Sequence, residues 1–118
     1  MDMTYSEFLL LAGKHKMVPV YKQILADLLT PISAYLRLSQ NSKYSFLFES
    51  VEKGTRFSRY SYIGRNPQKI INFADNKTTI TENNLNYESP NSYLDNLRTL
   101  VSSYSSCQIS GFPGFTGG

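Results

Sequence analysis

The stretch YSFLFESVEKGTRFSRYSYIG, residues 44–64, is the part of the chain that decides its fold. Its first run, 44–51, is dense in aromatic and aliphatic residues, which is typical of a strand with both faces covered. A second run, 58–64, has a similar composition and follows a loop around EKGTR. Two such runs joined by a short loop with glycine predict two strands that form a hairpin.

The first of these strands ends on polar side chains, which a buried strand does not need. Glu49 and Ser50 close it, and the return segment carries Arg56 and Arg59. One interpretation is a hairpin-end ion pair that satisfies Glu49, worth about 0–1 kcal/mol if exposed. The other is a ligand pocket, in which a carboxylate and a hydroxyl accept hydrogen bonds from an ammonium group. The residue pattern alone leaves both interpretations open.

Three segments carry helix signals. Thr4 and Glu7 have the spacing of a capping box, and Thr30 followed by Pro31 is typical of a helix start. Helices are therefore predicted near residues 5–12, 31–39 and 91–105, the last opened by Ser89-Pro90. One face of each is apolar, and we expect it to be buried. These faces comprise Tyr5, Phe8, Leu9 and Ala12; Ile32, Tyr35 and Leu36; and Tyr93, Leu94, Leu97, Leu100, Val101 and Tyr104.

The remaining segments predict further strands. Val18, Val20 and Ile24 share one face of a β-branched segment, which indicates a strand after Pro19. Residues 66–82 read as two strands with a turn at Asp75 to Lys77, whereas 83–92 reads as a loop. The fold class predicted is α+β, with a mostly antiparallel sheet packed against about three helices.

Composition restricts the class of protein. The chain has 118 residues, a net charge of +3 and 41% hydrophobic residues, which suits one small folded domain or one lobe of a larger protein. Its start has no signal peptide or membrane span, and its single cysteine suits a reducing compartment. We therefore expect a soluble, cytoplasmic protein. The basic residues form no cluster, and KGTRFSRYSY does not fit the spacing of an RNA-binding strand, so neither nucleic acid nor membrane is expected as a partner.

No set of catalytic residues emerges from the sequence. His15 is the only histidine and Cys107 the only cysteine, so a histidine-based triad or a metal cage lacks its members. The glycine-rich end GFPGFTGG, residues 111–118, lacks the lysine and the helix of a phosphate-binding loop. We interpret this end as a connection into further chain.

Three segments in order resemble one known family. They are VPVYKQILADLLTPISAYLRL, then YSFLFESVEKGTRFSRYSYIGRNPQKII, then GFPGFTGG. Together they resemble the N-terminal region of anthranilate synthase component I, in which similar segments read IPVYREILADLDTPVSAYLKL, FLLESVEGGERWGRYSFIG-x-x-P and PFTGG-x-x-GY. The resemblance runs from Val18 to the end, and FES…RYS-x-IG-x-x-P is its most specific block. It implies that residues 1–118 are the N-terminal region of that enzyme, without its chorismate-binding catalytic region.

The resemblance also implies a function. The full-length enzyme of that family is a lyase that converts chorismate to anthranilate and pyruvate in tryptophan biosynthesis. It uses Mg²⁺ bound beside chorismate and ammonia from a glutamine amidotransferase partner, component II. The catalytic and metal-binding residues belong to the region absent here, so the resemblance implies no catalytic or metal residue within the 118-residue chain and an inactive fragment. The N-terminal region supports the catalytic part and forms one side of an allosteric feedback site for L-tryptophan.

The inhibitor site is carried over residue by residue. The family's Leu-Leu-Glu-Ser motif matches residues 47–50, with Phe48 in place of the second leucine. The resemblance therefore implies that Ser50 and Glu49 contact tryptophan and that Arg59 approaches the site. Two alternatives remain. One is component I of aminodeoxychorismate synthase, in the folate pathway; the other is a free-standing, non-catalytic binding module.

Overall fold

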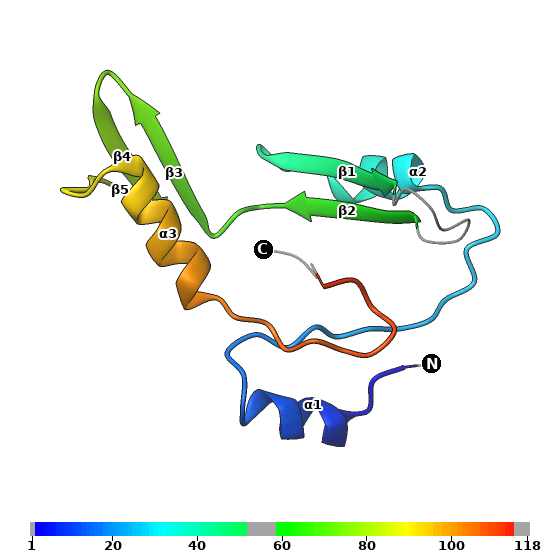
Figure 1. Cartoon of the computed structure of the whole chain (residues 1–118). Helices are drawn as coiled ribbons and strands as arrows, with labels where there is room; N and C mark the ends of the chain where they lie inside the picture. Colours follow the sequence, from blue (N-terminus) through cyan, green and yellow to red (C-terminus); the bar gives the residue numbers. More distant parts are fainter. Residues whose placement is uncertain (1, 52–58, 115–118) are drawn as a thin grey trace. The chain divides into compact units, whose positions relative to one another are not determined.

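The computed structural model describes residues 2–51 and 59–114, and it confirms the α+β class. Two compact units are present: residues 25–69 form one, and residues 1–24 together with 70–118 form the other. Figure 1 shows the elements in chain order, coloured along the sequence. They are α1 (Tyr5–Ala12), α2 (Pro31–Leu38), β1 (Ser45–Val51), β2 (Arg59–Arg65), β3 (Lys69–Ala74), β4 (Lys77–Glu82), β5 (Leu85–Glu88) and α3 (Tyr93–Ser103).

The unit of residues 25–69 consists of a two-stranded antiparallel ribbon, β1–β2, with α2 packed against both strands. Helix α2 begins where the sequence predicts. Thr30 accepts a hydrogen bond from the Ser33 amide at 3.1 Å, and the Ser33 hydroxyl accepts one from the Thr30 amide at 2.9 Å. With Pro31 in the first helical position, this reciprocal cap sets the start of the helix.

The other unit contains the sheet β3-β4-β5 together with α1 and α3. The predicted turn between β3 and β4 is confirmed, because Asp75 and Asn76 have positive φ angles of 51° and 63°. The capping box of α1 is confirmed as well: the Glu7 carboxylate accepts from the Thr4 amide at 2.7 Å. That hydrogen bond holds the pKa of Glu7 below its ordinary value of 4.5.

Two element predictions are wrong. The segment around Val18 to Ile24 is extended without being a strand, with a single parallel bridge between Met17 and Ser106. Tyr21 accepts a backbone hydrogen bond from Met3 at 3.2 Å, so this part of the chain is held by scattered contacts instead of a ladder. Conversely, part of the predicted loop 83–92 forms β5.

The strand β5 exists because of the turn that precedes it. Asn83 and Asn84 have φ angles of 51° and 61°, the left-handed pair that a two-residue hairpin turn requires. Helix α3 likewise begins later than predicted. Its N-cap is Ser92, whose hydroxyl accepts from the Asp95 amide at 3.2 Å, whereas Ser89 instead donates its amide to Thr78.

The helix faces that the sequence predicts as buried are largely open. Ile32 and Leu36 of α2, and Leu94 and Val101 of α3, are exposed, because neither small sheet offers enough surface to cover them. Four of the described residues are buried: Thr78, Ile80, Ser89 and Cys107. All four lie in the unit that holds the three-stranded sheet, so the small core sits there.

Candidate functional site

The polar end of the β1–β2 ribbon is where the sequence places its candidate residues. The ladder runs from the pair Ser45 with Arg65 to the pair Val51 with Arg59. Within it Glu49 pairs with Ser61, and Ser50 pairs with Tyr60. The backbone thus gathers Glu49, Ser50 and Arg59 into the last three rungs, as the hairpin prediction requires.

The side chains at this end are described only in part. Glu49 has an exposed side chain. For Ser50 and Arg59 the structure describes the backbone and not the side chain, and Arg56 lies outside the described residues altogether. The ion-pair and the pocket interpretations of these residues both stay predictions.

One face of the ribbon is covered by α2. The Tyr35 hydroxyl lies 3.0 Å from the Ser45 hydroxyl and forms a hydrogen bond with it, which ties the helix to the start of β1. Leu47 and its cross-strand partner Ile63 lie on the same face and are half-buried. Because side chains alternate along a strand, Glu49 also belongs to this face.

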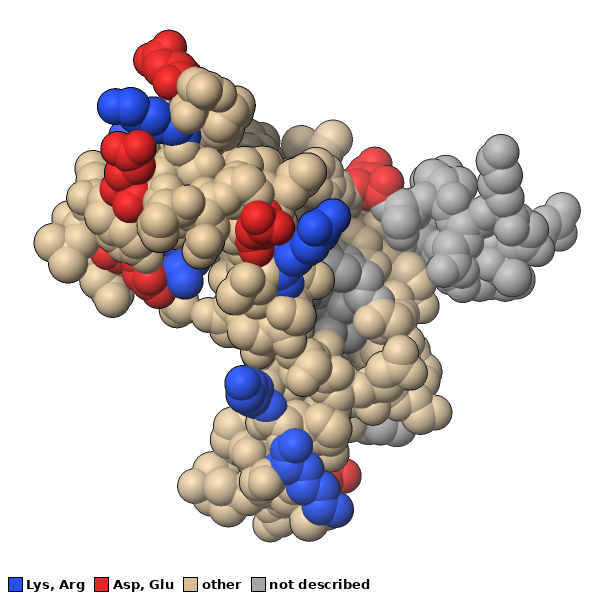
Figure 2. All heavy atoms as spheres, turned by 60° about the vertical axis from the view of Figure 1, so that its left-hand side comes forward, with Lys and Arg blue, Asp and Glu red and all other residues tan. Residues whose placement is uncertain are grey.

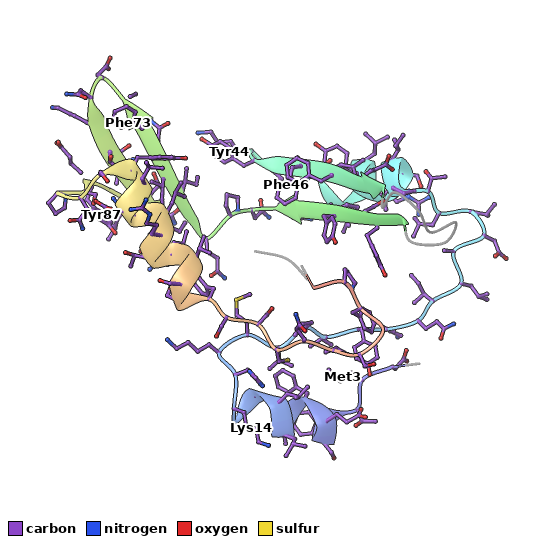
Figure 3. All side chains as sticks on the ribbon, in the orientation of Figure 1. Met3, Lys14, Tyr44, Phe46, Phe73 and Tyr87 are labelled. Atoms are coloured by element: carbon purple, nitrogen blue, oxygen red, sulfur yellow. The ribbon has the colours of Figure 1, made fainter. Side chains whose placement is uncertain are left out.

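The opposite face of the ribbon carries an aromatic pair. The rings of Phe46 and Phe48 stack with centroids 4.7 Å apart and planes at 29° (Phe46 is labelled in Figure 3). Gly64 pairs with Phe46 across the ladder, and a Cβ at that position would collide with the Phe46 ring. The glycine therefore lets the phenyl ring lie flat across the neighbouring strand.

This packing was missed at the level of sequence. The strand register could have revealed it. When the residues of the two strands are paired outward from the loop that joins them, Gly64 comes to lie opposite Phe46. A glycine in a strand interior often marks the close approach of another group, which here is an aromatic ring.

The other end of the ribbon is closed by local hydrogen bonds. Ser42 donates its hydroxyl to the Tyr44 carbonyl at 2.7 Å, and the Asn66 amide donates to the same carbonyl at 3.2 Å. Asn66 adopts a left-handed φ of 48°, which turns the chain toward Pro67 and β3. The two ends thus differ: hydrogen bonds between residues 42, 44 and 66 hold one end, where the chain enters β1 and leaves β2, and the other end carries the polar residues Glu49, Ser50 and Arg59.

Neither metal ligands nor a membrane span are found in the part of the chain that the structure describes. No three carboxylate, histidine or cysteine side chains of residues 2–51 and 59–114 lie close enough together to bind a metal ion. Among the same residues, no helix has the length and apolar character needed to cross a bilayer. His15 is exposed, as expected for a surface residue, and Cys107 is buried beside Met17, whose carbonyl accepts from the Cys107 amide at 3.3 Å.

The sequence is similar to curated members of one enzyme family. It is 40% identical over 110 residues to the probable anthranilate synthase component 1 of Schizosaccharomyces pombe, which spans 92% of this chain and 19% of the relative. It is 33% identical over 116 residues to anthranilate synthase component 1 of Acetivibrio thermocellus, 98% of this chain and 23% of the relative. The protein of that name from Mycobacterium tuberculosis is 50% identical over 58 residues, 49% of this chain and 11% of the relative.

These similarities confirm the resemblance that the sequence motifs indicate. The chain is thus similar to proteins named anthranilate synthase component 1. It spans about a fifth of the length of the first two relatives. No family model matches the sequence, and no solved structure matches it.

Proposed function

We propose that this chain forms part of an anthranilate synthase component I, a lyase that makes anthranilate and pyruvate from chorismate in tryptophan biosynthesis. The observation that carries the proposal is the similarity to anthranilate synthase component 1 over 92–98% of the chain in two distant organisms. The reaction belongs to the whole protein, and the 118-residue chain alone is expected to be inactive. We place the enzyme in the cytoplasm.

Partners and cofactor follow from the same proposal. Ammonia would come from a glutamine amidotransferase subunit, and chorismate and Mg²⁺ would bind to the catalytic region. The resemblance implies that the Mg²⁺ ligands belong to that catalytic region, so we assign none to residues 1–118. The contribution of residues 1–118 is then to support the catalytic region and to present a regulatory site.

The regulatory site that we propose is the polar end of the β1–β2 ribbon, occupied by L-tryptophan. A carboxylate at Glu49 and a hydroxyl at Ser50 supply acceptors for the ammonium group of an amino acid. Arg59 adds a positive charge that suits the amino acid's carboxylate. Because neighbouring residues of a strand face opposite sides, one ligand reaches both Glu49 and Ser50 only at the end of the ribbon.

Inhibition at such a site needs a second part of the protein. Tryptophan inhibits only if it binds the inactive arrangement more tightly than the active one. Glu49 is exposed, so the ribbon end alone does not enclose a ligand. If the catalytic region formed the other side of the site, tryptophan binding would be coupled to the position of the catalytic region relative to residues 1–118.

The enzyme proposal is tested with the longest reading frame that contains these 118 residues. The purified protein is given chorismate, Mg²⁺ and ammonium, and anthranilate is measured by its fluorescence. We expect anthranilate to form and tryptophan to suppress its formation. Aminodeoxychorismate as product would move the protein to the folate pathway, and no turnover of chorismate would contradict the enzyme proposal.

The regulatory site is tested in the same protein with Ser50→Ala and Ser50→Phe. Both variants should raise the tryptophan concentration that halves the activity. Ser50→Phe should raise it at least about tenfold, because a phenyl ring would fill the site. Tenfold corresponds to a loss of about 1.4 kcal/mol of binding free energy. Ser102→Ala is the matched control, because among the described residues the Ser102 hydroxyl donates to the Thr99 carbonyl of its own helix. Unchanged inhibition in both Ser50 variants would leave the ribbon end without a regulatory role.

A further inference from the structure

We draw no further inference here: the strongest candidate, the exposed apolar face of α3 with Leu94 and Val101, carries none because nothing in the structure shows what covers it, and the acidic and basic side chains mixed over the upper part of the view in Figure 2 do not single out a partner of one charge.

Discussion

The β4–β5 hairpin and the β1–β2 ribbon are both antiparallel pairs, but they are stabilised differently. The hairpin has a two-residue turn at Asn83 and Asn84, and it contributes Ile80, which is 6% exposed, to the small core. The ribbon has more aromatic residues and a longer ladder, yet none of its side chains that the structure describes is buried. Local turn geometry and two buried side chains of β4, Thr78 and Ile80, support the first pair, whereas the second depends on surfaces that cover it.

Loss of the buried apolar side chain of β4, Ile80, should have the largest effect on stability. Ile80→Ala should lower the free energy of unfolding by about 3 kcal/mol, because it removes buried methyl groups and leaves a cavity. Leu47→Ala in the ribbon is the matched change, and it should cost only about 1 kcal/mol, because Leu47 is half-buried. Urea titration of each variant measures both values. Equal costs would remove the contrast between the two pairs.

The turn of the hairpin should show the next largest effect. Asn84→Val should cost about 1–2 kcal/mol, because a β-branched residue is strained at the left-handed φ of 61°. Asn84→Gly keeps that conformation accessible and should change stability by only a few tenths of a kcal/mol. The same titration, with NMR signals of β5 as the local probe, compares them. If the valine variant is as stable as the glycine variant, the turn does not support the hairpin.

In the ribbon, the contact between Phe46 and Gly64 should give a smaller effect. Gly64→Ala should cost about 1 kcal/mol, because the Phe46 ring has to move away from the added methyl group. In a Phe46→Ser background the ring is absent, and the same change should be neutral or slightly stabilising. A double-mutant cycle in urea measures the coupling. Equal costs in the two backgrounds would show that the ring does not rest on the glycine.

The smallest effect concerns the cap of α1. Since the pKa of Glu7 is held below 4.5 by the Thr4 amide, the capping box stabilises α1 above that pH, and this stabilisation is lost as the pH falls through the lowered pKa. The NMR shift of the Thr4 amide should follow this titration. Glu7→Gln should abolish the pH dependence, and a Thr4 amide shift that still titrates in that variant would assign the change to another group.

The sequence predicts those elements whose signals are local. The capping box at Thr4, the helix start at Thr30 and Pro31, and the aromatic runs of β1 and β2 all give correct elements, because each signal acts within a few residues. The strand expected around Val20 fails because a strand needs a ladder partner, and β-branched composition does not reveal whether one is present. The pair Asn83–Asn84 is typical of a two-residue hairpin turn and could have predicted β5. The prediction missed it because the polar composition of residues 83–92 was interpreted as a loop.

The candidate site was predictable only in its position. The register places Glu49, Ser50 and Arg59 in adjoining rungs, as a hairpin that turns after Val51 requires. Whether they bind a ligand depends on groups distant in sequence, which periodicity and spacing do not encode. The identification of the family came from matched motifs, whereas the reason why β1 ends in polar residues stays a prediction.

The most direct test of this account is calorimetric titration of L-tryptophan into the 118-residue chain and into the longer protein that contains it. On our proposal the exposed ribbon end provides only one side of the site, so the chain alone should bind tryptophan with a dissociation constant above about 1 mM or show no binding. The longer protein should bind it at least about tenfold more tightly, and Ser50→Phe should remove that gain. Micromolar affinity of the 118-residue chain alone would contradict the account.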